Sequence, residues 1–395
     1  MSTPTYDPAS NDQRSMGAAG PGRLDVPTDV TGADVPPERA HRAAFGAGQS
    51  AQVGADELLR VQDLAVDFPT DDGLVRAVRG VSYTLHSGEV LGIVGESGSG
   101  KSVSSMAVMG LLPRNARISG SISFRGKDVL GMSAQTRRSL RGRKIAMIFQ
   151  DPMTALNPVH TIGAQLAEAV LSHELMPRKH AMARAEETLA LVGIPQPKAR
   201  LRNYPHEFSG GMRQRAIIAM AIINGPDVII ADEPTTALDV TVQAQILEKL
   251  IDVKDQVGAA IVLITHDLGV VAGMAHRVLV MYAGKAVEVG TTDDAFYRAR
   301  MPYTAGLLGS IPRHEELAGG RLRPIVGSPP SLIDLPSGCS FSPRCPLATE
   351  LCHREEPALT GTDDPRHLAA CHHWEQLAAV DDPSTFFRSE SERSR

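Results

Sequence analysis

Short runs of consecutive apolar residues alternate along the chain with segments in which apolar residues recur every three or four positions. Four runs are of strand length and nearly all apolar, at 89–94, 145–148, 227–232 and 259–264. Such runs are typical of a sheet that is buried on both faces. The segment at 240–257 instead carries its apolar residues on one face of a predicted amphipathic helix. The alternation predicts an α/β fold in which helices cover both faces of a sheet.

The first part of the ordered chain follows a different pattern. Residues 58–68 and 76–85 alternate between apolar and polar side chains on either side of a turn, which predicts a hairpin. A further strand is predicted at 118–124. Between about 160 and 225 the apolar residues follow a helical period and prolines interrupt it. This change predicts an inserted helical subdomain.

The two ends of the chain lack both patterns. Residues 1–56 are rich in Pro, Gly, Ala, Asp and Ser and contain few aliphatic side chains. Such a segment cannot bury enough apolar surface to offset the entropy lost on ordering, so we expect a disordered arm. We also expect a disordered tail at 376–395, which ends in Ser, Glu and Arg residues.

Length and charge restrict the class of protein. At 395 residues, the chain is long enough for two folded units with tails. The formal net charge of −5 gives no indication of an obligatory nucleic-acid partner. The apolar runs are too short to span a bilayer, and the N-terminus lacks the hydrophobic segment of a secretory signal. We therefore expect a cytosolic protein that works at a membrane only by docking on other subunits.

The run at 89–94 leads into a phosphate-binding motif. Residues 95–102 match the pattern G-x-x-x-x-G-K-[ST] and precede a predicted helix at 103–109. The glycines let backbone N–H groups turn towards one concavity at a helix N-terminus. We expect Lys101 to reach the β- and γ-phosphates of a nucleotide and the Ser102 hydroxyl to ligate Mg²⁺. The predicted nucleotide contacts of this segment are Gly95, Glu96, Ser97, Gly98, Ser99, Gly100, Lys101, Ser102 and Val103.

Two carboxylates and one aromatic residue complete the chemistry that the residues themselves indicate. Asp232 ends the apolar run at 227–232 and is expected to hold Mg²⁺ through water. Glu233 follows it and is expected to accept a proton from the attacking water. Phe68, at the end of its predicted strand, suits stacking on a nucleobase. A phenylalanine of the core is the alternative.

The order of the remaining motifs carries a family resemblance. After the phosphate loop come Gln150, the run Phe208-Ser-Gly-Gly-Met-Arg-Gln214, the two carboxylates, Ala237-Leu-Asp239 and His266. Over about 57–313 this order resembles the nucleotide-binding subunit of an ATP-binding-cassette (ABC) transporter. Phe and Met flank the Ser-Gly-Gly element where Leu and Gln are usual, whereas Ser-Gly-Gly itself is intact. The resemblance implies a phosphate-loop ATPase domain at 57–290 with a mixed-sheet core, an antiparallel β subdomain and an inserted helical subdomain.

The resemblance also implies a role for each motif residue. Gln150 would sense Mg²⁺ and the water, and would link the site to a transmembrane partner through 151–158. His266 would hold the γ-phosphate. The implied catalytic residues are Lys101, Gln150, Glu233 and His266, and the implied Mg²⁺ ligands are Ser102, Gln150 and Asp232. In a head-to-tail dimer, Ser209, Gly210 and Gly211 would contact the γ-phosphate bound on the facing subunit, and Asp239 would bridge the two subunits. Gln214 and Asp239 are further implied nucleotide-binding residues.

The residues after the cassette carry a second family resemblance. The segments at 301–308, 324–332 and 338–346 are similar to the C-terminal extension of oligopeptide/dipeptide and nickel importer ATPases, over about 291–375. This implies an ATPase at the cytoplasmic face of the plasma membrane. Its implied partners are a second ATPase subunit (a copy or a paralogue), two permease subunits and an extracytoplasmic peptide-binding protein. Two alternatives stay open: import of nickel or another small solute, and a soluble ABC ATPase that acts on nucleic acid. The single cassette with its short helical insertion disfavours the latter.

All four cysteines lie in this extension, in the order Cys339-x5-Cys345-x6-Cys352-x18-Cys371. In a chain expected to be cytosolic, this grouping indicates metal or redox chemistry in preference to disulfides. Four thiolates suit zinc or an iron–sulfur cluster, and the C-x-x-C element usual for zinc is absent. The resemblance favours a [4Fe–4S] cluster in a small cysteine-containing domain. Zinc and plain reduced cysteines are the alternatives.

Overall fold

The computed structural model describes residues 56–151, 155–235, 239–310 and 325–387. The arm expected at the N-terminus, part of the loop after Gln150 and the end of the expected tail lie outside the described residues. Two further predicted positions, Ala237 and Leu238, also lie outside them.

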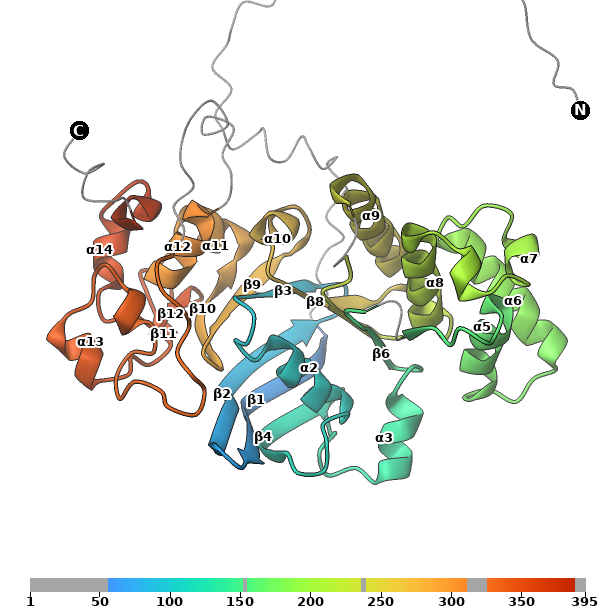
Figure 1. Cartoon of the computed structure of the whole chain (residues 1–395), viewed down its shortest axis with the longest axis horizontal. Coiled ribbons are helices and arrows are strands. Elements are labelled where there is room, and N and C mark those ends of the chain that lie inside the picture. The colour runs from blue at the N-terminus through green and yellow to red at the C-terminus, as the bar shows by residue number, and fades with distance from the viewer. Residues whose placement is uncertain (1–55, 152–154, 236–238, 311–324, 388–395) are drawn as a thin grey trace, which may run out of the picture. The chain divides into compact units, whose positions relative to one another are not determined.

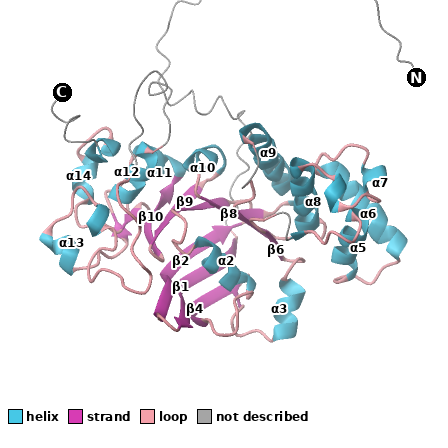
Figure 2. Cartoon of the chain, viewed as in Figure 1, coloured by secondary structure: helices cyan, strands magenta, loops and turns pink. Residues whose placement is uncertain are grey.

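A mixed sheet of eight strands forms the centre of the described chain (Figure 2). From edge to edge its strands are β11 (Thr360–Gly361), β12 (Leu368–Ala369), β10 (Lys285–Thr291), β9 (Arg277–Tyr282), β3 (Val90–Val94), β8 (Ala260–Thr265), β7 (Val228–Asp232) and β6 (Ile145–Ile148). The strands from β9 to β6 are parallel, and those from β9 to β11 pair antiparallel. Every residue of β3, β6, β7 and β8 is buried, as their continuous apolar sequence predicts.

A second, antiparallel sheet faces the first. Its strands are β2 (Gly73–His86), β1 (Glu57–Thr70), β4 (Arg117–Phe124) and β5 (Lys127–Asp128). One buried apolar cluster joins Leu59 of this sheet to Ile93 of β3 and Val108 of helix α2 (Lys101–Met109). The phosphate loop therefore leaves the large sheet at a point where both sheets and α2 are packed together.

Helices gather at one end of the large sheet, beside β6 (Figure 1). They are α5 (Ile162–Leu171), α6 (Arg178–Leu191), α7 (Pro197–Arg200), the 3₁₀ turn η1 (Pro205–Glu207) and α8 (Gly210–Ile222). Three further helices connect strands of the two sheets in the chain: α3 (Ala134–Leu140) precedes β6, α9 (Val240–Val257) joins β7 to β8, and α10 (Leu268–Met274) joins β8 to β9. Helices therefore occupy the segment in which we predicted a helical subdomain, and their buried residues Leu166 and Leu189 belong to the same apolar cluster as Ile229 of β7. None of the helices among the described residues combines the length and apolar character needed to cross a bilayer.

The C-terminal extension is continuous with the cassette sheet, and the small cysteine-containing domain that we predicted is not confirmed. Its strand β12 pairs with β10, where Ala369 faces Glu288 and Leu368 faces Val289. Its Phe341 is buried against Tyr282 of β9, with ring centroids 5.3 Å apart. The remaining elements are α11 (Thr292–Tyr297), α12 (Pro302–Gly309), η3 (Ser342–Arg344), α13 (Glu350–Arg354), α14 (Trp374–Ala378) and η4 (Pro383–Phe387).

Part of the tail that we expected to be disordered is ordered. Within 376–387 the structure places the end of α14 and the turn η4, and Leu377 is fully buried. Phe387 packs on α12, where a Cβ added to Gly306 would lie 2.9 Å from its ring. Local composition missed this order because a few apolar side chains suffice when a preformed surface receives them.

Candidate functional site

The phosphate loop is held by close backbone packing. Gly100 caps α2 in a left-handed conformation (φ 99°), and a Cβ there would lie 2.3 Å from the Ala77 carbonyl oxygen of β2. A Cβ on Gly95 would lie 2.2 Å from the Met281 oxygen of β9. Because these approaches exclude any side chain, the two glycines are required for the loop to pass between the sheets.

Lys101 points back into the loop that precedes it. Its ammonium donates hydrogen bonds to the carbonyl oxygens of Gly95 (2.6 Å) and Glu96 (2.9 Å). The residue is 5 % exposed. Burial lowers the pKa of Lys101, although the nearby carboxylates of Glu233 and Asp232 act in the opposite direction. A positive charge is therefore held inside the concavity of the loop.

Ser102 and Asp232 meet although they are far apart in the sequence. The Ser102 hydroxyl donates to Asp232 Oδ1 at 3.0 Å, from the first turn of α2 to the end of β7. Burial raises the pKa of Asp232, and the Ser102 hydrogen bond partly offsets this effect. A hydroxyl and a carboxylate oxygen in contact are the ligand pair expected for Mg²⁺ beside a phosphate loop.

Glu233 is the centre of a second group. Gln150 Nε2 donates to Glu233 Oε2 at 2.9 Å, and His266 Nδ1 lies 3.3 Å from Glu233 Oε1. These residues follow the adjacent parallel strands β6, β7 and β8, whose carboxyl ends share one edge of the sheet. Glu233 also has a positive φ of 46°, which is uncommon for a residue other than glycine. The fold thus directs this carboxylate at the same edge as the phosphate loop.

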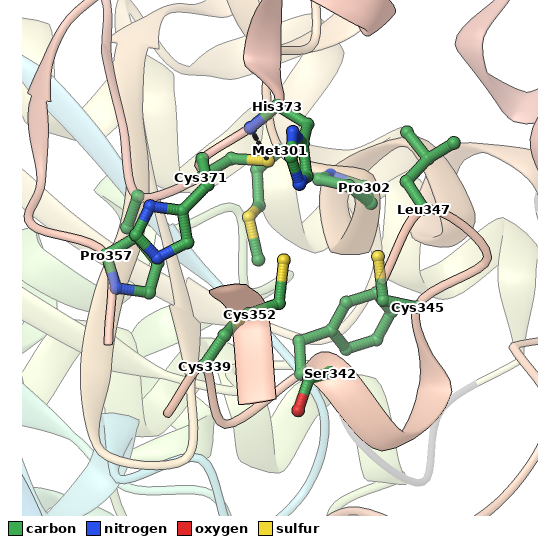
Figure 3. A pocket seen from close by; sticks show the side chains of 13 residues that line it. Met301, Pro302, Cys339, Ser342, Cys345, Leu347, Cys352, Pro357, Cys371 and His373 are labelled. Atoms are coloured by element: carbon green, nitrogen blue, oxygen red, sulfur yellow. Dashed lines mark hydrogen bonds between the residues drawn. The ribbon is translucent and has the colours of Figure 1, made fainter. Parts of the chain in front are cut away.

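The four cysteines line one pocket of the extension. Figure 3 shows their side chains together with Met301, Ser342 and His373 around it. All four are free thiols. Burial raises the pKa of Cys345 and of Cys371 to about 12. In the part of the chain that the structure describes, no three His, Cys, Asp or Glu side chains are arranged to hold a metal ion. The predicted iron–sulfur cluster is therefore not supported by this geometry. The structure shows only that the four cysteines line the same pocket.

Comparison with known proteins matches both parts of this arrangement. Residues 78–236 match the family described as ABC transporter, and residues 287–352 match the C-terminal region of oligopeptide/dipeptide transporters. The chain is 54% identical over 318 residues to the dipeptide transport ATP-binding protein DppD of Bacillus subtilis, which covers 80% of this chain and 94% of that protein. The chain belongs to the oligopeptide/dipeptide-transporter ATP-binding proteins of the ABC family. The family resemblance read from its motifs is confirmed.

Other relatives extend this result. The chain is 50% identical to the oligopeptide transport ATP-binding protein OppD of Escherichia coli and covers 94% of it. It is 55% identical to OppD of Mycobacterium tuberculosis but spans only 51% of the length of that relative. Among solved structures, cbiO1 of Clostridium perfringens, part of an ABC transporter complex, is 28% identical with a TM-score of 0.53, over 61% of this chain and 91% of that one. The ABC ATPase fold with its mixed and antiparallel sheets is confirmed.

In this ABC ATP-binding protein, the Ser-Gly-Gly motif forms the N-terminus of α8. Ser209 caps α8 and accepts from the Met212 N–H at 3.3 Å, and Asp239 caps α9 and accepts from the Val242 N–H at 3.0 Å. Both residues are exposed. Helix α8 packs on α5, α6, α9 and β6. Among the described residues, no hydrogen bond or ion pair joins Ser209 or Asp239 to the segment at 95–102.

Two other predicted ligand contacts are only partly available in this ABC protein. Gln214 lies on the buried face of α8 and is fully buried, so its amide is not presented to a nucleotide in this structure. Phe68 is half-buried and packs against the apolar cluster of the antiparallel sheet. Phe68 therefore contacts the apolar core, which was the alternative to its stacking on a nucleobase. Arg344 and Tyr303, which contact Glu96 of the phosphate loop, were missed because no local pattern marks them.

Proposed function

We propose that this chain is the ATP-hydrolysing subunit that energises an ABC importer for dipeptides or oligopeptides. The observation that carries the proposal is the convergence of Ser102, Asp232 and Glu233 with Gln150 and His266 at one edge of the sheet. Phosphoryl transfer needs positioning and charge neutralisation more than covalent chemistry, and this group supplies both.

Each residue has a distinct part in the proposed reaction. The loop N–H groups and Lys101 bind the phosphates, and Lys101 neutralises charge that develops on the γ-phosphate. Ser102, Asp232 and Gln150 would hold Mg²⁺, which supplies further charge neutralisation when bound. Glu233 accepts a proton from the attacking water, and His266, beside it, orients the γ-phosphate and the water.

The proposed active unit contains two cassettes. Ser209 and Asp239 are exposed, and the side chain of each accepts a hydrogen bond that caps its own helix, α8 or α9. The N-terminus of α8 presents backbone N–H groups that favour an anion. We propose that Ser209, Gly210, Gly211 and Asp239 complete the ATP site of a second ATPase subunit, either a copy or a paralogue, in a head-to-tail arrangement.

The proposed assembly includes membrane subunits. Matches to oligopeptide and dipeptide transport proteins support two permease partners and a peptide-binding protein outside the membrane. We place the chain at the cytoplasmic face of the plasma membrane, bound to the permeases around Gln150. A nickel or other small-solute importer is the second candidate for the cargo, because the extension resembles both kinds of importer.

We further propose that the cysteine pocket holds a [4Fe–4S] cluster. Four thiols from separate parts of the extension line one largely apolar pocket, which is the donor set that such a cluster takes. Zinc held by the same four thiolates is the alternative, and metal analysis of the purified chain distinguishes the two. When bound, the cluster would cross-link Cys339, Cys345, Cys352 and Cys371.

The decisive experiment is affinity purification of the full chain from membranes of its host, with identification of the subunits that co-purify. Two permeases and a peptide-binding protein, with ATP hydrolysis by the complex, are the expected result. Co-purification with nickel-binding partners would indicate that the importer transports nickel and not peptides. Recovery with nucleic acid and no permease would refute the transport function.

A further inference from the structure

The phosphate loop is held by a residue from outside the cassette. Arg344, in the turn η3 of the extension, donates two nearly parallel hydrogen bonds to Glu96, from Nη1 to Oε2 at 2.8 Å and from Nη2 to Oε1 at 3.0 Å. Tyr303 of α12, also in the extension, accepts the backbone N–H of Glu96 at 2.8 Å. The extension thus contacts both the side chain and the backbone of one loop residue.

The Arg344 side chain is fixed and mostly removed from solvent. It is 5% exposed, whereas the Glu96 side chain is 25% exposed. Its guanidinium carbon lies 5.9 Å from the ring centroids of Tyr282 and of Phe341, and Nη1 also donates to the Tyr282 hydroxyl at 3.3 Å. A bidentate contact to a carboxylate is a feature that Arg provides and Lys does not. The charge of Arg344 is therefore placed accurately against Glu96.

The position of Glu96 makes this contact relevant to nucleotide binding. Its backbone oxygen accepts from the Lys101 ammonium, and its carboxylate is near enough to favour the charged form of Lys101. A carboxylate beside a bound triphosphate repels it, and the repulsion is strong where water is scarce. Arg344 offsets this negative charge with a positive one.

We propose that Arg344 is a positioning residue for ATP binding, through which the C-terminal extension orients and neutralises Glu96 of the phosphate loop. The proposal rests on ATP being the ligand of this loop. It gives the extension a direct part in the nucleotide site, beyond any role of its cysteines.

The extension has a second set of ionic contacts that serves as a control. Glu356 accepts from Arg79 Nη2 at 2.9 Å and from Lys285 Nζ at 2.5 Å. These contacts bind the extension to strands β2 and β10 of the cassette. In the part of the chain that the structure describes, none of the three side chains bonds to residues 95–102. If Arg344 only docked the extension, loss of the Glu356 contacts would have the same effect on ATP affinity.

The test is the equilibrium affinity of the purified full chain for ATP, measured by titration calorimetry. We expect Arg344→Gln to raise the Kd about tenfold, equivalent to about 1.4 kcal/mol. Arg344→Lys keeps the positive charge but loses the pair of parallel hydrogen bonds, so it should raise the Kd for ATP about threefold. Glu356→Gln should change it less than twofold. In a Glu96→Gln background, Arg344→Gln should have less than a twofold effect, because no carboxylate is left to neutralise.

The outcomes separate this proposal from its alternatives. An unchanged Kd in Arg344→Gln overturns it. So does an equal loss of affinity in the Glu96 and Glu96→Gln backgrounds, because that pattern belongs to a docking role. Should Arg344→Gln fail to fold, Arg344→Lys in the two backgrounds gives the same comparison. If the unaltered chain does not bind ATP, or Lys101→Ala binds it equally well, the proposed function itself fails.

Discussion

Replacing Glu233 by Gln removes a proton acceptor and keeps the shape of the side chain. In the structure, the Glu233 carboxylate accepts from Gln150 Nε2 at 2.9 Å and lies 3.3 Å from His266 Nδ1. An amide oxygen can still accept from Gln150, but an amide cannot take a proton from water. Neither side chain is favoured by the positive φ at this position, so the backbone cost is the same for both. We expect a variant that binds ATP and does not hydrolyse it.

The size of the effect follows from the role. A positioned general base contributes about 10²- to 10⁴-fold to a rate. Each factor of ten corresponds to about 1.4 kcal/mol, so the activation barrier should rise by about 3 to 5 kcal/mol. The affinity for ATP should change less than threefold, because Lys101, Ser102 and the loop N–H groups are untouched.

The assay is single-turnover hydrolysis at saturating ATP and Mg²⁺, combined with the Kd for ATP and gel filtration in the presence of ATP. Glu248→Gln, on the exposed side of α9, is the matched control and should leave the rate unchanged. A trapped dimer in Glu233→Gln would agree with the two-cassette unit. A rate within threefold of that of the unaltered chain would refute the general-base assignment.

Four further expectations concern the loop, the cysteines and the tail. Lys101→Ala should abolish ATP binding, because it removes the buried ammonium from the loop; retained affinity in a binding titration would count against the loop assignment. Gly100→Ala should also abolish ATP binding, since a Cβ would lie 2.3 Å from the Ala77 oxygen; Gly126→Ala, where a Cβ meets no atom within 4 Å, is the control for a left-handed glycine. Protein purified without oxygen should contain iron and sulfide in nearly equal amounts by chemical analysis, and Cys345→Ser should lose both; zinc without iron would contradict the cluster. Leu377→Ala should lower the free energy of unfolding by about 2 to 4 kcal/mol in a urea titration, because the side chain is fully buried; no change would show that α14 does not pack on the extension.

Much of the nucleotide site was predictable from the sequence. The buried strands at 90–94, 228–232 and 260–265 appeared as continuous apolar runs, and Gly95, Glu233 and His266 follow directly after them. Parallel neighbouring strands bring their carboxyl ends to one edge of a sheet. The Ser102–Asp232 and Gln150–Glu233 contacts lie at that edge.

Other features depended on packing that local patterns do not contain. Gln214 lies within a sequence motif, yet the rotation of α8 against α5, α6 and α9 places its side chain in the interior. The tail at 376–395 was expected to be disordered because of its composition, whereas Leu377 is fully buried and Phe387 is half-buried beside α12. In both cases, whether the side chain is buried depends on which part of the protein packs against its segment.

The sequence by itself determined the chemistry of this protein, because a phosphate loop, two carboxylates and a histidine at strand ends specify their own local geometry. Only the tertiary structure decided how the C-terminal extension relates to that chemistry. The strand β12 continues the cassette sheet, and Arg344 reaches Glu96 across 248 residues of sequence. A contact over such a separation has no local signature, since it depends on the sum of all the packing between its two ends.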